Sequence, residues 1–447
     1  MNTPIADFIE AYEKAEIARF HMPGHKGKGD FYRDITEIRG ADELYAADGI
    51  INESEENASR LFKSAHSYYS TEGSTLAIKA MLTLASCERP CGERPLFVAA
   101  RNCHKAFVYG MAMLDGEVSW VYSDDSHICK CDITPKRVEE AIRRCRRKPD
   151  GVYVTSPDYL GNIADIRGIA EVCDRCGVPL LVDNAHGAYL AFLEENMHPM
   201  ALGASMCADS AHKTLPVLTG GAYLHIAEKA KRFCGRARAA MSLYASTSPS
   251  YLILRSLDLC NRYLFDDGRK RFFDTVGRVK DVKERLAKNR IVTEGDEPLK
   301  ITLNAPASGY FGAELADAVR RAGIEPELSD GDYVVFMVTE FNSDAELERL
   351  FSFLCSLEGR EPIETENVSL GAANGVISIR EAVFADFESV SVTDAEGRIC
   401  ASPTVSCPPA VPIAVSGELI DAARVRAFLR YGINSVCVVK KQTEIFF

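Results

Sequence analysis

Residues 151–184 read GVYVTSPDYLGNIADIRGIAEVCDRCGVPLLVDN, and this stretch decides the fold. It starts with an apolar, β-branched run, GVYVTS (151–156), and ends with a second such run, PLLVDN (179–184). Between them, residues 165–176 have the apolar spacing of a helix. A strand, a helix and a strand in this order form a unit with two parallel strands. Because both runs are almost entirely apolar, we expect strands that are buried on both faces.

Similar runs on either side extend this pattern from about residue 73 to about residue 230. The sequence therefore predicts an α/β fold, with a large domain built on a mainly parallel sheet that helices cover. The further predicted elements are strands at PLFVAA (95–100), VSWVYS (118–123) and GAYLHI (221–226), and a helix over 134–147.

The rest of the chain divides into two smaller parts. Helices over 313–322 and 344–357 alternate with strands, of which YVVFMVT (333–339) is the clearest, and this predicts a compact α+β domain. The last segment has two short β-rich runs, VISI (376–379) and VCVV (436–439), and is predicted to be a short C-terminal α+β lobe. The predicted domains are 1–290, with the N-terminal segment and the large domain, 291–362 and 363–447.

The composition is that of an ordinary globular protein. The 447 residues are 47% hydrophobic and 26% charged, and no apolar run is long enough to cross a membrane. The formal net charge of −12 argues against nucleic acid or an anionic membrane as the main partner. Because the N-terminus is acidic and helical, we expect no secretory signal and a cytoplasmic location. In that compartment the fifteen cysteines are expected to be reduced thiols.

Two polar residues follow predicted strands of the large domain. Asp183 ends PLLVDN, and Lys213 lies in DSAHKT (209–214), just before the strand 221–226. The carboxyl ends of the strands line the ligand crevice of an open α/β sheet, and a carboxylate there pairs with a cation or a protonated ring nitrogen. Burial favours the free amine that a lysine needs to form a Schiff base. Taken singly, Asp183 is also typical of a helix cap, and Lys213 of a structural residue.

A glycine turn and a histidine add two more features. TEGST (71–75) precedes a helical run, and its glycine and hydroxyls at a helix N-terminus form a potential anion site. His104 opens a helix after the strand 95–100. Each also has an ordinary interpretation, as an N-cap or as a structural histidine. In this order, the four features suit a cofactor that has a phosphate, a pyridine nitrogen and an aldehyde.

With these motifs the chain resembles the Orn/Lys/Arg decarboxylases, which are pyridoxal-phosphate enzymes with the aspartate-aminotransferase fold (fold type I). It is similar to the short members, without the flavodoxin-like N-terminal domain of the larger ones. The resemblance covers most of the chain in the family's order, except roughly 290–360. The matching motifs are FHMPGHKG (20–27), DITEIRGADEL (34–44), EGST (72–75), RNCHKA (101–106), TSPDYLGNIADI (155–166), DNAHGA (183–188), DSAHKT (209–214), STSPSY (246–251), SIREAVFA (378–385) and the segment 397–418 that contains SCPPAVP (406–412).

The resemblance implies a role for each matching residue. Lys213 forms the Schiff base with pyridoxal 5′-phosphate, Asp183 pairs with the ring nitrogen, and His104 stacks on the ring. It also implies that His212 is catalytic beside these three, and that the cofactor is further held by Ser74, Thr75, His186, Ser210, His212, Thr247 and Ser248. In related enzymes the region that matches Thr247 and Ser248 reaches the phosphate across a dimer interface, so we expect a homodimer, or a higher homo-oligomer, with active sites at the subunit interface.

The implied reaction is removal of CO2 from a small basic amino acid, which gives a polyamine-type amine. Arginine comes first, before lysine and ornithine, because short members often use it. The basic end of the substrate needs carboxylates, for which Glu418, Asp42 and Glu37 are the candidates. No metal site is expected, because the Pro-Gly between His21 and His25 breaks a helical spacing.

Two departures from the family pattern keep alternatives open. The family commonly has Glu where this chain has Asn184, and Pro where it has Ser416. One alternative is a pyridoxal-phosphate aminotransferase or β-eliminating lyase, with Arg380 as the residue that would hold the substrate α-carboxylate. The other is a non-catalytic regulatory module, and only Asn184 and Ser416 support it.

Overall fold

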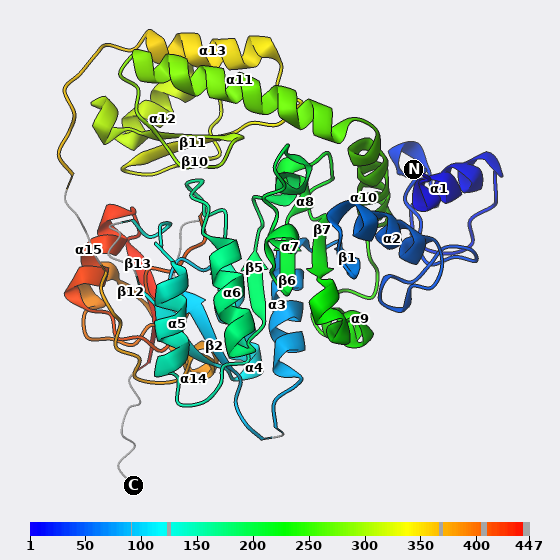
Figure 1. Cartoon of the computed structure of the whole chain (residues 1–447), viewed down its shortest axis with the longest axis horizontal. Helices are drawn as coiled ribbons and strands as arrows, with labels where there is room; N and C mark the ends of the chain where they lie inside the picture. Colours follow the sequence, from blue (N-terminus) through cyan, green and yellow to red (C-terminus); the bar gives the residue numbers. More distant parts are fainter. Residues whose placement is uncertain (91, 123–126, 366–369, 404–408, 441–447) are drawn as a thin grey trace. The chain divides into compact units, whose positions relative to one another are not determined.

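The computed structural model describes residues 1–90, 92–122, 127–365, 370–403 and 409–440, which form two compact units (Figure 1). The first unit comprises Met1–Arg89, Asp150–Ser156 and Asp165–Thr275, and the second comprises Pro90–Pro149, Pro157–Ala164 and Val276–Phe447. Ser123, at the end of a predicted strand, and residues 406–408 of the SCPPAVP segment lie outside the described residues. The domain boundaries given by the sequence stay a prediction.

The first unit contains five sheet strands in the order β1-β7-β6-β5-β4. The pairs β4–β5 and β5–β6 are parallel, whereas β6–β7 and β7–β1 are antiparallel. The prediction of an α/β fold with a parallel core is therefore confirmed, and every residue of β5, β6 and β7 is buried. The strands are β1 (His66–Ser70), β4 (Gly151–Thr155), β5 (Leu180–Asp183), β6 (Met206–Asp209) and β7 (Ala222–Ile226).

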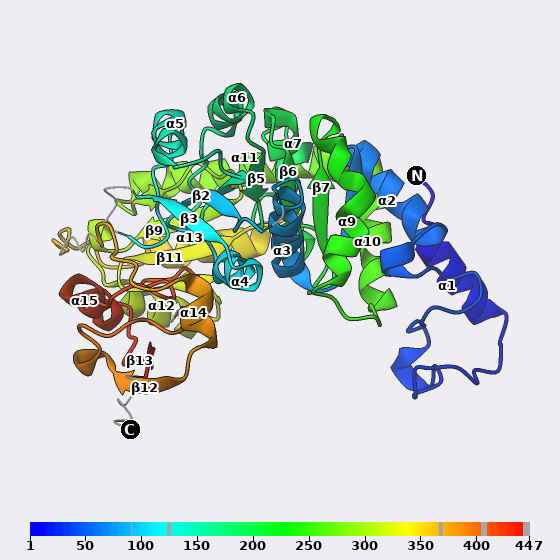
Figure 2. The same cartoon turned by 90° about the horizontal axis from the view of Figure 1, so that it is seen from below.

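Helices cover these strands on both sides. Helices α6 and α7 lie on one side, and α3 on the other, where it packs against β6 and β7 (Figure 2). Helix α6 begins where the Asp165 side chain accepts from Gly168 N at 2.9 Å, and it ends at Gly177 with φ +64°. The helices of the unit are α1 (Pro4–Lys14), α2 (Ile50–Phe62), α3 (Gly73–Ser86), α6 (Ile166–Cys176), α7 (Pro199–Leu202), α8 (Ala211–Thr214), α9 (Cys234–Ser242), α10 (Tyr251–Tyr263) and the start of α11 (Arg269–Lys288).

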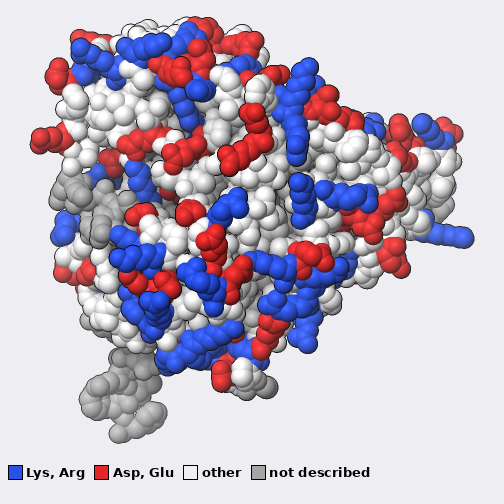
Figure 3. Space-filling model, viewed as in Figure 1, with Lys and Arg blue, Asp and Glu red and all other residues white. Residues whose placement is uncertain are grey.

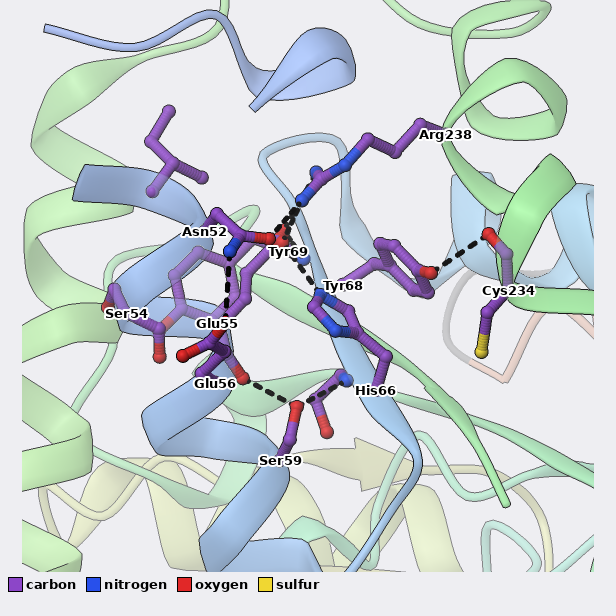
Figure 4. A network of polar contacts seen from close by, with 12 residues as sticks. Asn52, Ser54, Glu55, Glu56, Ser59, His66, Tyr68, Tyr69, Cys234 and Arg238 are labelled. Atoms are coloured by element: carbon purple, nitrogen blue, oxygen red, sulfur yellow. Dashed lines mark hydrogen bonds and ion pairs between the residues drawn. The ribbon is translucent and has the colours of Figure 1, made fainter. Parts of the chain in front are cut away.

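A buried glutamate fastens several elements of the first unit together (Figure 4). The Glu55 side chain, on α2, is fully buried, and its Oε2 lies 2.6 Å from Arg238 Nη2 and 3.1 Å from His66 Nε2. Its Oε1 accepts from Tyr69 N at 2.9 Å, and Arg238 Nη1 donates to Leu44 O at 2.8 Å. A buried carboxylate is stabilised by cations and hydrogen-bond donors in contact with it. Glu55 therefore ties α2, β1, α9 and the loop before α2 to one another.

The second unit holds three separate β structures. Strands β2 and β3 are parallel, a four-stranded antiparallel sheet has the order β10-β11-β9-β8, and β12 pairs with β13. The strands are β2 (Leu96–Ala100), β3 (Glu117–Val121), β8 (Thr293–Glu294), β9 (Lys300–Asn304), β10 (Leu328–Ser329), β11 (Tyr333–Met337), β12 (Phe387–Ser391) and β13 (Ser435–Val439). The helices are α4 (Lys105–Leu114), α5 (Pro135–Arg144), α12 (Gly312–Arg321), α13 (Asp344–Cys355), α14 (Ile379–Phe384) and α15 (Ala422–Arg430).

In this unit one predicted element is wrong, and one predicted helix forms but is shorter than predicted. No strand forms over 376–379, because Ser378 and Glu381 make a capping box that starts α14 instead. The helix predicted over 134–147 ends at Arg144, since Cys145 adopts an extended backbone. Beyond it, Arg146 Nη2 lies 2.5 Å from Glu117 Oε2.

The surface in Figure 3 mixes acidic and basic side chains, without a broad field of one sign among the residues described on that face. Among the described helices, none is both long enough and apolar enough to span a bilayer.

Candidate active site

The parallel strands β5 and β6 bring two carboxylates to one edge of the first unit's sheet. Asp183 is the last residue of β5 and is aligned with Ala208 of β6. The Asp183 side chain is 2% exposed, and it accepts from Tyr153 Oη at 2.9 Å and from Ala185 N at 3.2 Å. Burial raises the pKa of Asp183, although Tyr153, Lys213 and the Ala185 amide partly offset the shift. A buried carboxylate with a raised pKa is strongly stabilised by a nearby cation.

Lys213 lies in the short helix α8 that follows β6, and its amine reaches the same edge. Lys213 Nζ is 2.8 Å from Nε2 of His186, which is 5% exposed and follows the end of β5. The charge of Lys213 acts to lower the pKa of Asp183. The structure therefore brings Lys213, His186 and Asp183 together, as expected for a site at the carboxyl ends of parallel strands.

A potential phosphate site lies at the start of α3. Gly73 has φ +71°, no atom lies within 4 Å of where its Cβ would be, and no side chain caps the helix. Ser210 Oγ donates to Ser74 Oγ at 2.8 Å, so the residue before α8 meets the first turn of α3. The Gly73 N–H donates to Gly220 O at 2.8 Å, and the N–H groups that follow it, the helix dipole and the two hydroxyls are the elements of a potential anion site. Thr75, in the same turn, is exposed.

His212, next to Lys213, is half-buried. Its Nδ1 lies 3.0 Å from Gly221 O, so the neutral ring has its proton on Nδ1 and a lone pair on Nε2. Burial lowers the pKa of His212, with the charge of Lys213 adding to the shift and the Gly221 carbonyl opposing it. His212 Nε2 can thus accept a proton at neutral pH, whereas donation to a phosphate requires the imidazolium form.

These residues fit pyridoxal 5′-phosphate. The uncapped helix with open space at Gly73 matches its phosphate, the buried and incompletely paired Asp183 matches a protonated ring nitrogen, and the Lys213 amine matches its aldehyde. All three features belong to the first unit.

Thr247 and Ser248 are exposed and lie near the start of α3 in their own chain. The neighbouring Ser246 donates its backbone N–H to Glu72 Oε1 at 2.6 Å, and Glu72 directly precedes Gly73. Whether these hydroxyls contact a phosphate, and in which subunit, stays a prediction.

His104 belongs to the second unit. It is the N-cap of α4, as the sequence predicted, and its Nδ1 accepts from Ala106 N at 3.1 Å. Its proposed stacking on the cofactor ring stays a prediction.

The three carboxylates predicted to bind substrate have different surroundings. Both oxygens of Asp42 accept backbone N–H groups at the start of α2, with Gly49 N at 2.8 Å. Glu418, in the second unit, lies 3.1 Å from Arg101 Nη2 through Oε2, which also accepts from Val415 N at 2.8 Å. Glu37 Oε2 accepts from Thr36, but its Oε1 is buried with no hydrogen-bond partner among the described residues.

Several residues around Asp183 and Asp209 were not predicted from the sequence. Tyr153 lies on β4, and nothing in the sequence pairs it with a residue thirty positions later. Asp209 stands in the DSAHKT motif, and its place at a strand end was a usable signal. Its partners His198 and His225 lie in segments without a recognisable motif, so only the folded chain connects them.

Comparisons with known proteins cover nearly the whole chain. Residues 3–301 match the Orn/Lys/Arg decarboxylase major domain, and residues 372–435 match the C-terminal domain of the same family. The arginine decarboxylase of Halalkalibacterium halodurans is 29% identical over 96% of this chain and 93% of its own length. That of Bacillus subtilis is 27% identical over 94% of this chain and 91% of its own length.

Solved structures agree on the fold. The lysine decarboxylase LdcF of Francisella novicida superimposes with a TM-score of 0.80 and 18% identity, over 98% of this chain and 81% of that one. Serine palmitoyltransferase of Sphingomonas wittichii has a TM-score of 0.58 with 13% identity, over 79% of this chain and 83% of that one. The chain thus belongs to the Orn/Lys/Arg decarboxylase family and is a pyridoxal-phosphate-dependent amino-acid decarboxylase.

Proposed function

We propose that this enzyme decarboxylates arginine, with lysine and ornithine as the next candidates. The observation that carries the proposal is the amine of Lys213 beside His186, at the sheet edge where Asp183 ends β5. The arginine decarboxylases of Bacillus subtilis and Halalkalibacterium halodurans match this chain over more than 90% of both lengths, which favours arginine.

Pyridoxal phosphate, when bound, supplies an aldehyde that reacts with amines and a ring that accepts the electron pair left by departing CO2. Asp183 holds a proton on the ring nitrogen, because its buried carboxylate is stabilised by a cation in contact. Lys213 would hold the cofactor and give the substrate Cα the proton that takes the place of the departed CO2. His186, 2.8 Å from Lys213 Nζ, orients this amine and exchanges a proton with it. His212 is the second histidine available for proton transfer.

Among the predicted substrate carboxylates, Glu37 is the strongest candidate for the basic end of the substrate. Its Oε1 is buried without a partner among the described residues, whereas Asp42 uses both oxygens to hold the start of α2. Glu418 already faces the cation of Arg101, although its Oε1 also has no hydrogen-bond partner in the described part of the chain. A guanidinium contacts a free carboxylate oxygen more strongly than one that other donors occupy.

We also propose that the enzyme works as a cytoplasmic homodimer in polyamine formation. Several apolar side chains of the first unit are exposed, which is typical of a surface that a partner covers: Phe20 at 96%, Leu243 at 69%, Met22 at 54% and Phe31 at 53%. The exposed Thr247 and Ser248 lie in the segment next to Leu243 and are available to a second subunit.

An aminotransferase or β-eliminating lyase is the second candidate, and the surroundings of Arg380 count against it. Arg380 Nη1 donates to the carbonyls of Ala112 and Met113, at 3.2 and 3.3 Å, and its guanidinium lies over the Phe384 ring. This arginine is therefore occupied by its own unit and is a poor holder of a substrate carboxylate.

The test is product analysis with the purified full-length protein and added pyridoxal phosphate. We expect CO2 and the corresponding amine from arginine, with slower or no turnover of lysine and ornithine, and no keto acid. A keto acid instead of CO2 would establish the second candidate. Glu37→Gln is expected to raise KM for arginine about tenfold while kcat changes little. Asp42→Asn serves as the comparison, because it loosens the start of α2 and lowers stability first.

A further inference from the structure

A second buried carboxylate, that of Asp209, ends β6 beside the end of β5. The Asp209 side chain has no exposed surface, and four donors reach it. Oδ1 accepts from Asn184 Nδ2 at 2.8 Å and from Cys207 Sγ at 3.2 Å. Oδ2 lies 2.8 Å from His198 Nε2 and 3.1 Å from His225 Nε2. So many donors around one carboxylate stabilise its charged form.

The two histidines act as donors in this cluster. His198 Nδ1 accepts from Met200 N at 3.3 Å, so the proton of the neutral ring is on Nε2, toward Asp209. His225 Nδ1 lies 2.7 Å from Ser67 Oγ, which leaves its Nε2 to donate to Asp209. Burial lowers the pKa of His225, against the opposing effect of Asp209, so this ring does not cancel the carboxylate charge at neutral pH.

His198, Cys207 and Asp209 are close enough together to hold a metal ion, but the hydrogen bonds of His198 and Cys207 run to the Asp209 carboxylate. A metal takes a histidine lone pair and a thiolate, whereas His198 Nε2 carries a proton. Burial, together with the charge of Asp209, raises the pKa of the Cys207 thiol well above its usual range, so it stays protonated. The donors serve the carboxylate.

The charge of Asp209 acts on Asp183. Burial by itself raises the pKa of Asp209, but His198 and His225 outweigh it and hold the pKa well below its usual range. Asp209 is therefore negative at neutral pH. The pKa of Asp183 is raised chiefly by its own burial, and the negative charge of Asp209 adds to that shift. Any cation that pairs with Asp183 is thus stabilised by two carboxylates.

Asn184 connects the two carboxylates through the backbone. It directly follows Asp183, its N–H donates to Ala208 O at 2.9 Å, and its side chain donates to Asp209. Gly187 is required nearby, because a Cβ there would collide with Asn184 Oδ1. The residue after Asp183 is therefore fixed at both its backbone and its side chain.

We propose that Asp209 is a positioning residue for the cofactor ring, acting through Asn184 and Asp183. Asn184 holds the end of β5 so that the Asp183 carboxylate faces the ring nitrogen, and the fixed charge of Asp209 favours a nitrogen that carries a proton. The inference rests on the proposed pairing of Asp183 with that nitrogen. It also assigns a task to Asn184, where the family pattern commonly has a glutamate.

The experiment compares two ligands on the full-length apoprotein: pyridoxal phosphate and its 1-deaza analogue, in which C–H replaces the ring nitrogen. Dissociation constants are measured by absorbance titration for the wild type and for Asp209→Asn. We expect Asp209→Asn to weaken the binding of pyridoxal phosphate about five- to tenfold and that of the analogue less than about twofold. Asn184→Leu removes the hydrogen bond between residue 184 and Asp209 but keeps the Asp209 charge. It should change the ratio of the two dissociation constants in the same direction as Asp209→Asn, by a smaller factor.

Asp258→Asn is the matched control, because Asp258 is also fully buried in the first unit but bonds to Ser54 Oγ and Ala6 N. Its ligand ratio should equal that of the wild type.

Equal weakening of both ligands by Asp209→Asn, or no weakening, would overturn the inference and leave a structural role. Stoichiometric zinc in the wild type that is lost in the variant would overturn it too. If Asp209→Asn does not fold, the Asn184→Leu ratio decides. A wild type that binds both ligands equally would instead contradict the proposed pairing of Asp183.

Discussion

Asp183 and Asp209 end neighbouring parallel strands and are equally inaccessible to water, yet they are in opposite electrostatic states. Asp209 is met by four donors, and its pKa is held well below the usual range. Asp183 has two donors, Tyr153 and Ala185 N, and burial raises its pKa. The chain itself satisfies Asp209, whereas no cation among the described residues forms an ion pair with Asp183. A buried carboxylate with a raised pKa at the carboxyl end of a parallel strand supports the proposal that Asp183 serves a ligand.

Removal of Lys213 should have the largest effect on activity. It takes away the amine that holds the cofactor and the positive charge that lowers the pKa of Asp183. Lys213→Ala should lower kcat/KM by at least about 10⁴-fold and abolish the visible absorption of the cofactor near about 420 nm. Turnover assays and an absorption spectrum measure both effects. Residual turnover within tenfold of the wild type would mean that another residue holds the cofactor.

Asp183→Asn should lower kcat about 10³-fold, since an amide stabilises a protonated ring nitrogen far less than a carboxylate does. The apoprotein should nevertheless be as stable as the wild type or more so, because the raised pKa means that the buried charge costs free energy. Urea unfolding of the apoprotein gives the stability. A large loss of stability would show that Asp183 is as fully satisfied as Asp209.

Asp209→Asn should lower the stability of the apoprotein, in contrast to Asp183→Asn. Its amide offers a donor where histidine donors converge, and the variant should lose about 3 kcal/mol of unfolding free energy at neutral pH. The same urea experiment on the apoprotein measures this loss. A variant as stable as the wild type would place Asp209 in the same class as Asp183.

The two carboxylates should also differ in pH dependence. The depressed pKa of Asp209 contributes stability above about pH 4, its unfolded value, and this stability is lost as the pH falls through the folded value. The raised pKa of Asp183 contributes in the other direction: its stability is present below about pH 4 and is lost as the pH rises through the folded value. Between pH 4.5 and 7.5, Asp183→Asn should therefore gain stability relative to the wild type, while the Asp209→Asn deficit stays constant. Parallel curves for the two variants would contradict this assignment.

Tyr153→Phe should have the smallest effect and sharpens the comparison. It removes one of the two donors to Asp183, so the pKa of that carboxyl should rise further. We expect a three- to tenfold lower kcat and a stability change of about 1 kcal/mol. Tyr251, whose hydroxyl donates to Asp42 O, is the matched control: Tyr251→Phe should lower stability without lowering kcat by the same factor.

Much of the fold follows from local pattern. The apolar runs 151–156 and 179–184 and the helix between them lie where the sequence predicts them, because burial on both faces imposes a nearly unbroken apolar run. The error at 376–379 has the opposite origin. Four β-prone residues are too few to outweigh the capping box of Ser378 and Glu381, which starts a helix.

The residues of the candidate site also differ in whether the sequence predicts them. Lys213, Asp183 and the Gly73 turn stand out in the sequence because each needs a particular residue type at the end of an element. The assembly around Asp209 does not stand out, because its donors come from four segments and a histidine in an apolar strand, such as His225, is usually structural.

By itself, the sequence determined the α/β architecture, the order of the cofactor motifs and the family, since these depend on residue types at short, regular spacings. Only the tertiary structure decided which carboxylates are already paired. Asp42 holds the start of α2, Glu418 faces Arg101, Asp209 is surrounded by donors, and Asp183 has no ion pair with a cation among the described residues. The charge state of a carboxylate depends on its burial and on donors brought from distant segments, and neither exists until the chain has folded.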